Sequence, residues 1–228
     1  MLRMHRKRRK RKKTKNKSIP SPSFKKGREP KRLILYNMSH LHLLDRCGIV
    51  IFRSIMRKTN RQNTIEIVGD VSSTVAMEFR RKIEELSARG SPEVVFLINS
   101  MGGCVVSGLA MFMAVKEYKG RTVGKVVGAA ESMAAVVLQA CTERLCVKRG
   151  HILIHHIRPS YLDLLSFQTD AQETAYFTQL DTYNQIVLGV LRDRTKQSDE
   201  VIAELCDTEM RIKSQKALEL NLIDLIIK

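Results

Sequence analysis

Short apolar runs alternate with segments of helical periodicity from about residue 64 to the C-terminus. The runs Thr64–Val68, Val94–Ile98 and Thr122–Val127 are rich in β-branched residues, which are typical of strands. Between the first two runs, apolar residues over 75–86 recur at spacings of four and three, which predicts an amphipathic helix. Strands that alternate with helices predict crossover connections, a largely parallel sheet and an α/β fold.

Turn residues and further apolar runs place the remaining elements. Gly69-Asp70 predicts a turn that ends the first strand, and Gly90-Ser91-Pro92 predicts the end of the first helix. The other expected elements are helices over 105–118, Ser132–Ala140 and Ser198 to about Leu205, strands at Ile152–Ile154 and Ile223–Ile227, and a helical turn at Ala217–Leu220. In such sheets, ligands bind where the strands end in loops.

The segment from Thr169 to about Arg194 predicts a long helix with apolar side chains on more than one face. A helix this long and this apolar in a small domain needs a packing partner, and another subunit is the natural one. We therefore expect the protein to self-associate through this helix.

The formal charge of +17 is concentrated near the N-terminus. Residues 1–32 hold 16 of the 40 Lys and Arg residues and one of the 23 Asp and Glu residues, which leaves a net charge of +2 elsewhere. Charge repulsion and the lack of apolar residues predict a disordered tail. The tail is interpreted as a solvated extension; weak contact with nucleic acid or an acidic surface, and an organelle transit peptide, are the alternatives.

Residues 33–62 show a mixed pattern to which no structure is assigned, so the sequence predicts one globular domain over 63–228. The longest apolar stretch, Val126–Cys141, is interrupted by Glu131 and is shorter than the roughly 20 residues that span a bilayer. Five cysteines occur without a CxxC pair or a preceding secretory signal, at Cys47, Cys104, Cys141, Cys146 and Cys206. We therefore expect a soluble cytoplasmic protein without disulfides, metal or nucleotide.

Candidates for the groups of a serine hydrolase follow three successive strands. Ser132 lies between a strand and a helix among small residues, Gly102-Gly103 follows the Val94–Ile98 strand, and His155 follows Ile152–Ile154. Acyl transfer by serine needs an activated hydroxyl, a base and backbone donors for the oxyanion. Taken singly, these are more often a capping serine, a turn and a structural histidine, and His156 makes the choice of base ambiguous. Their combination and order favour a serine peptidase.

The same residues carry a resemblance to the proteolytic subunit of the Clp ATP-dependent protease, within the crotonase-like superfamily. Residues 97–103 (LINSMGG) resemble the family's I-N-S-P-G-G, and residues 130–134 (AESMA) resemble its A-A-S-M-G. Residues 152–156 (ILIHH) resemble I-M-I-H-Q, and residues 217–224 (ALELNLID) resemble A-x-E-Y-G-L-I-D. The resemblance covers about residues 64–228 and implies a layered α/β fold with a long protruding handle helix.

The resemblance also implies residue roles and partners. Ser132 would be the nucleophile, His155 the base, and the amides of Gly103 and Met133 the oxyanion hole. The helix at 169–194 would be the handle helix, which packs two heptameric rings together. An AAA+ unfoldase ATPase would deliver unfolded polypeptides to the chamber.

Several positions depart from the family's pattern. The triad aspartate falls on Glu209 when counted back from Leu222-Ile223-Asp224, and Asp207 lies two residues earlier. Glutamate serves as the acid in some hydrolases, so Glu209 is preferred and Asp207 is the alternative. Glu131, beside the nucleophile, would raise the basicity of His155 or point to solvent. Cys104 would line the cleft or be a small buried thiol.

The predicted function is therefore a self-compartmentalising serine endopeptidase. The main alternative is a catalytically weak structural subunit of a mixed ring, since the acid position is altered. An acyl-CoA enzyme of the same superfamily and a nucleic-acid-binding module that depends on the tail are the further alternatives.

Overall fold

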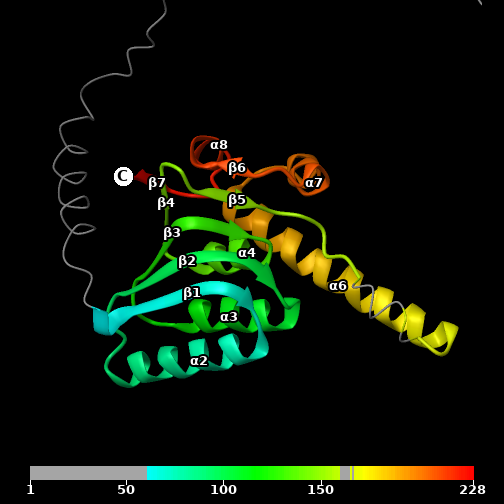
Figure 1. Cartoon of the computed structure of the whole chain (residues 1–228), viewed down its shortest axis with the longest axis horizontal. Helices are drawn as coiled ribbons and strands as arrows, with labels where there is room; N and C mark the ends of the chain where they lie inside the picture. Colours follow the sequence, from blue (N-terminus) through cyan, green and yellow to red (C-terminus); the bar gives the residue numbers. More distant parts are fainter. Residues whose placement is uncertain (1–60, 160–164, 166) are drawn as a thin grey trace, which may run out of the picture. The chain divides into compact units, whose positions relative to one another are not determined.

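The computed structural model describes residues 61–159, 165 and 167–228. The expectations for the basic tail over 1–32, and for nearly all of the segment over 33–62, lie outside these residues. Within them, a short 3-10 helix (Arg61–Asn63) leads into a sheet of seven strands with helices packed against it (Figure 1). The α/β class and the largely parallel sheet expected from the sequence are confirmed.

Five strands form the body of the sheet in the order β1-β2-β3-β4-β7, and all four pairings are parallel. These strands are β1 (Thr64–Val71), β2 (Val94–Gly103), β3 (Thr122–Glu131), β4 (Glu143–Val147) and β7 (Leu225–Ile227). Strand β5 (His151–Leu153) pairs with the far end of β3 in parallel, and β6 (Ile212–Lys213) pairs with β5 in antiparallel. The end of β3 therefore lies next to β5, and β5 lies next to β6.

Strands β1, β2 and β3 are longer than their apolar runs predict. Val68 and Asp70 flank a register shift, and Gly69 between them has a φ of 75°. The expected turn at Gly69-Asp70 is therefore wrong: β1 continues past it to Val71 as a strand with a bulge. Strand β2 likewise continues through Asn99–Gly103, so the glycine pair belongs to the strand and not to a turn.

The helices lie where their periodicity predicts them, within one to three residues. They are α2 (Ser73–Ala88), α3 (Val105–Glu117), α4 (Met133–Ala140), α6 (Asp170–Thr195), α7 (Asp199–Thr208) and α8 (Ser214–Glu219). Helix α2 buries Phe79, Ile83 and Leu86, and Ser198 caps α7 through Val201 N, as expected. Strands β4 and β6, which have no distinctive sequence pattern, were not predicted.

Helix α4 lies at the centre of the fold, and all eight of its residues are buried. It packs against β1, β2 and β3, against α3 and against α6 (Figure 1). The packing of α3 on α4 is close because Gly108 of α3 has no side chain. A Cβ atom at this position would lie only 2.7 Å from the side chain of Met133. The N-terminus of α4 is therefore held in a rigid environment, which matters because Ser132 precedes it.

Helix α6 is long, as expected, and its N-terminal part extends away from the sheet (Figure 1). Its buried residues are Val187, Leu191 and Thr195, all in its C-terminal half. Leu188 and Val190 are partly buried against the core, whereas Phe177 and Ile186 are exposed. The protruding long helix of the expected fold is therefore present.

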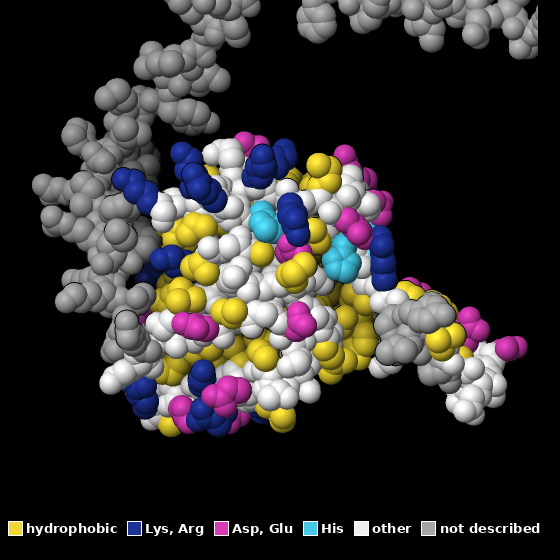
Figure 2. All heavy atoms as spheres, viewed as in Figure 1, with side chains coloured by type: hydrophobic (Ala, Val, Ile, Leu, Met, Phe, Trp, Pro, Cys, Tyr) yellow, Lys and Arg dark blue, Asp and Glu magenta, His cyan; other side chains and the backbone are white. Residues whose placement is uncertain are grey.

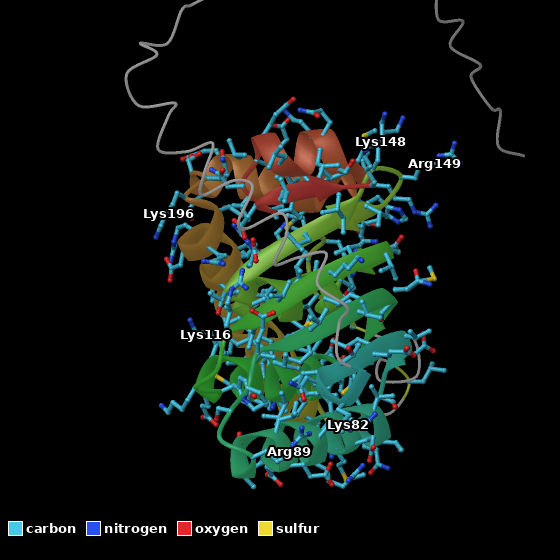
Figure 3. The ribbon with its side chains drawn as sticks, turned by 90° about the vertical axis from the view of Figure 1, so that its left-hand side faces the viewer. Lys82, Arg89, Lys116, Lys148, Arg149 and Lys196 are labelled. Carbon is cyan, nitrogen blue, oxygen red and sulfur yellow. The ribbon has the colours of Figure 1, made fainter. Side chains whose placement is uncertain are left out.

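Basic side chains do not gather in one region of the described residues. Lys82 lies on α2 and Arg89 caps its C-terminus. Lys148 and Arg149 lie at the opposite end of the view, beyond β4, and Lys196 caps the C-terminus of α6 (Figure 3). On the face in Figure 2, acidic and basic side chains are interspersed with exposed hydrophobic ones. This distribution agrees with the small net charge of the sequence outside residues 1–32.

Candidate active site

Ser132 occupies a sharp backbone turn between β3 and α4. Its φ of 54° and ψ of −124° are sparsely populated by residues other than glycine, and such strain persists only where surrounding contacts enforce it. The Ser132 amide donates to the carbonyl of Leu153 at 2.8 Å, which ties the turn to the end of β5. Its hydroxyl makes no capping bond to α4, so the interpretation as an ordinary capping serine is wrong.

The hydroxyl of Ser132 meets the imidazole of His155. The distance between Ser132 Oγ and His155 Nε2 is 2.9 Å, and His155 Nδ1 lies 2.7 Å from the carbonyl oxygen of His156. Because a carbonyl only accepts hydrogen bonds, Nδ1 of a neutral imidazole carries the proton in this arrangement. Nε2 is then free to accept the hydroxyl proton, as a general base must.

Both candidate acids contact other groups. Glu209 forms an ion pair with Arg158, and Asp207 Oδ1 lies 3.2 Å from His156 Nε2. Among the described residues, the hydrogen bonds of the His155 ring are those to Ser132 and His156, so neither carboxylate orients it. Glu209 ends α7 in a left-handed conformation with a φ of 47°, which directs the chain toward β6.

Backbone amides surround the turn at Ser132. Met133 is the first residue of α4, where amides have no acceptor within the helix. Gly102 lies against the turn: a Cβ atom there would be 2.6 Å from Ser132 Cβ and 2.9 Å from Met133 N. Gly103 lies against Val71 instead. Its amide nitrogen is therefore bonded to Gly102, the residue that touches Ser132. The two predicted oxyanion donors therefore belong to segments that meet at the serine.

Glu131 adopts neither of the arrangements expected for it. Its side chain is buried and accepts hydrogen bonds from His151 Nε2 at 2.7 Å and from Arg211 Nε at 3.0 Å. Burial raises the pKa of this carboxyl, but the hydrogen bonds from His151 and Arg211 and the charge of Arg211 together hold its pKa below the ordinary value. The carboxylate therefore neither points to solvent nor approaches His155.

Cys104 is exposed, so the expectation of a small buried thiol is wrong. Hydrogen bonds from Ser107 and Val106 at the start of α3 lower the pKa of its thiol. This cysteine follows the glycine pair and begins α3 as its capping residue.

Three residues near the site were not anticipated. His151 and Arg211 bind Glu131, and Asn184 of α6 holds the backbone two residues beyond His155. Asn184 Oδ1 accepts from Ile157 N at 2.7 Å, and its Nδ2 donates to Ile157 O at 3.3 Å. The sequence carries no signal for these contacts, because each joins residues 20 to 80 positions apart.

No set of three or more His, Cys, Asp or Glu side chains in the described part of the chain is arranged to hold a metal ion. Histidine side chains reach the surface on the face in Figure 2, among acidic and basic ones.

None of the helices over the described residues is long and apolar enough to cross a membrane.

A family model described as "Clp protease" matches residues 51–228. The chain belongs to the Clp protease family. The ATP-dependent Clp protease proteolytic subunit 1 of Chlamydia muridarum is 32% identical over 146 residues, which cover 63% of this chain and 73% of that one. The corresponding subunit of Carsonella ruddii is 25% identical over 179 residues, covering 77% of this chain and 89% of that one.

Another relative, the proteolytic subunit 1 of Protochlamydia amoebophila, is 30% identical over 168 residues, or 72% of this chain and 79% of that one. The modest identities indicate a divergent Clp protease. Membership confirms the resemblance found in the sequence, together with the fold that it implied, and it supports a peptidase.

Proposed function

We propose that residues 63–228 form the serine peptidase domain of a ring-shaped, ATP-dependent Clp protease that cleaves unfolded polypeptides. The observation that carries the proposal is the 2.9 Å contact between Ser132 Oγ and His155 Nε2. The strained backbone of Ser132 supports it, because such turns present a nucleophile at the end of a strand.

In the proposed reaction, Ser132 Oγ attacks the peptide carbonyl while Nε2 of His155 takes its proton. The tetrahedral oxyanion is stabilised by the amides of Gly103 and Met133 and by the N-terminus of α4. His155 then gives the proton to the leaving amine, which releases one product and leaves an acyl group on Ser132. Water, deprotonated by His155, hydrolyses this ester and restores the hydroxyl.

Glu209 remains the proposed acid of the triad, with Asp207 as the alternative. In the single subunit, the His156 carbonyl holds Nδ1 of His155 in the place of a carboxylate. Glu209 becomes available to His155 only if its ion pair with Arg158 opens. The proposal therefore includes a rearrangement of the segment 207–211 in the active assembly.

The assembly proposed is a heptameric ring, stacked in pairs through α6, in the cytoplasm. The exposure of Phe177 (36%) and Ile186 (45%) on the protruding helix supports a packing partner there. An AAA+ unfoldase would supply the polypeptides, because an enclosed chamber admits only unfolded chains. Extended substrates would pair with the edge of a strand beside Ser132, which gives broad sequence tolerance.

The test is hydrolysis of a short fluorogenic peptide by the wild-type chain, Ser132→Ala and His155→Ala. We expect both substitutions to lower kcat at least about 1,000-fold, since nucleophile and base act as a unit. A fluorophosphonate probe should label the wild type and not Ser132→Ala. Hydrolysis that survives Ser132→Ala unchanged would disprove the proposal.

One observation favours a second candidate, a structural subunit of a mixed ring with weak activity. Both candidate acids are held by other partners, Glu209 by Arg158 and Asp207 by His156. Under this alternative, the chain co-assembles with an active Clp subunit and labels slowly or not at all. The rate of fluorophosphonate labelling of the isolated chain separates the two candidates.

A further inference from the structure

Glu131 is a buried carboxylate directly before the proposed nucleophile, at a position where the family motif has alanine. Its relative exposure is 6%, and its ionised form is stabilised by His151 and Arg211. A buried charge is costly unless hydrogen bonds and an opposite charge compensate it. These contacts therefore determine where the three side chains, and the segments that carry them, are held.

The three segments are those that carry the proposed catalytic residues. Glu131 ends β3 and precedes Ser132; His151 begins β5, four residues before His155; and Arg211 lies two residues after Glu209 and precedes β6. Strand β5 pairs with β3 on one side and with β6 on the other. One carboxylate thus joins all three segments at the edge where the site is formed.

The ladders of β5 are short, with three residue pairs to β3 and two to β6. Strand β5 has three residues, and its ladder with β6 consists of two residue pairs, His151 with Lys213 and Ile152 with Ile212. So few backbone hydrogen bonds leave room for the segments to shift by fractions of an ångström. Catalysis is sensitive to such shifts, since a displacement of about 1 Å costs on the order of 100-fold in rate.

We propose that Glu131 is a positioning residue that, through His151 and Arg211, holds the segments bearing Ser132, His155 and Glu209 in register. Among the described residues, its side chain contacts His151 and Arg211 and neither of the reacting atoms, Ser132 Oγ and His155 Nε2, so its effect passes through the backbone. This role rests on the proposed peptidase function. It also accounts for the charged side chain at a position where the rest of the local motif uses small residues.

The test compares Glu131→Gln with a matched control, Glu143→Gln. Glu143 is a partly buried glutamate of the same sheet paired with an arginine, Arg121, but it lies beside the opposite end of β3. For Glu131→Gln we expect kcat for the fluorogenic peptide to fall about 10- to 100-fold, with KM changed less than about threefold. Glu143→Gln should match the wild type in both constants.

Two further variants separate positioning from general stability. Glu131→Asp retains the charge and should recover part of the lost kcat, whereas Glu131→Ala should not. Arg211→Gln should lower kcat by itself and add less than its full effect to Glu131→Gln, because the two side chains act through one contact. The proposal would be overturned if the effects of Glu131→Gln and Arg211→Gln on kcat were fully additive. It would also be overturned if Glu131→Gln and Glu143→Gln lost kcat in the same proportion to their fall in Tm.

Hydrogen exchange followed by mass spectrometry provides a readout that does not depend on activity. Glu131→Gln should increase exchange over residues 151–156 and 209–213, and Glu143→Gln should leave these segments unchanged. Unchanged exchange in Glu131→Gln would overturn the positioning role even in an inactive chain. If the wild type fails to label with fluorophosphonate but the two variants differ in exchange as expected, the peptidase function is overturned. The structural role of the Glu131 contacts is then retained.

Discussion

The Nδ1 atom of His155 lies 2.7 Å from the carbonyl oxygen of the next residue, His156. This contact selects the tautomer whose Nε2 accepts a proton from Ser132, without help from a carboxylate. A backbone carbonyl orients the ring but carries no full charge, so it stabilises a protonated imidazole less than an acid does. An acid would therefore still accelerate the reaction.

The first prediction concerns that acid. Glu209→Gln should lower kcat for a fluorogenic peptide about 10- to 100-fold, and Asp207→Asn should lower it less than about threefold. The loss should be smaller than the roughly 10,000-fold seen when a triad aspartate is removed, because the His156 carbonyl still holds Nδ1. A larger effect of Asp207→Asn would assign the role of triad acid to Asp207. Equal effects of the two substitutions would contradict the preference for Glu209.

The second prediction concerns Gly102, whose φ is 91° and where an added Cβ would lie 2.6 Å from Ser132 Cβ. Gly102→Ala should lower activity at least about 100-fold and destabilise the fold by about 2 to 4 kcal/mol, from the clash and the backbone strain combined. Gly69→Ala is the control, because Gly69 has a similar φ of 75° but no atom within 4 Å of the added Cβ. Gly69→Ala should lower the free energy of unfolding by about 1 to 2 kcal/mol and leave kcat unchanged. Peptide hydrolysis measures kcat, and urea denaturation measures the free energy of unfolding.

The third prediction concerns thiol reactivity. Cys104 is exposed with a lowered thiol pKa, whereas burial raises the pKa of Cys141 to about 12 and that of Cys146 and Cys206 to about 11. Because the thiolate is the reactive form, Cys104 should react with iodoacetamide at pH 7 at least about 100-fold faster than these three. Peptide mapping by mass spectrometry identifies the sites. Comparable labelling of Cys141 in the folded chain would contradict the structure.

The fourth prediction concerns the buried guanidinium of Arg144, which holds the C-terminal segment. It donates to Asp224, to Gln139 Oε1 at 2.6 Å and to the carbonyl of Asn221 at 2.7 Å. Removing the charge of Asp224 leaves Arg144 with incomplete partners, so Asp224→Asn should cost about 1 to 3 kcal/mol at pH 7. Thermal unfolding measures this cost, and Glu93→Gln, which breaks an exposed ion pair with Arg121, should cost less than about 1 kcal/mol.

The same pair predicts a dependence of stability on pH. Partial burial raises the pKa of Asp224, but the hydrogen bonds and charge of Arg144 outweigh it and hold the pKa below its ordinary value of 3.8. A carboxyl whose pKa is depressed by folding stabilises the fold at pH values above the ordinary pKa. That contribution is lost as the pH falls through the folded pKa. The stability difference between wild type and Asp224→Asn should therefore shrink below about pH 4.

The sequence determined the class of the fold, the helices, the strands other than β4 and β6, and the positions of Ser132 and His155 in the chain. These features follow from residues close together in the chain: β-branched runs, helical spacing over 75–86, and small residues around a serine. Family motifs at the same positions placed the two side chains at the ends of strands that the structure brings together, 2.9 Å apart.

Only the tertiary structure decided the partners of the charged side chains. Glu131 meets Arg211, which is 80 residues away, and Glu209 meets Arg158 and not the imidazole that the motif implies. The bulged extension of β1 was also decided at this level, because pairing with β2 outweighs the local turn preference of Gly69. Local patterns depend on neighbouring residues, whereas a charge pairs with whichever group the packing of distant segments brings within reach.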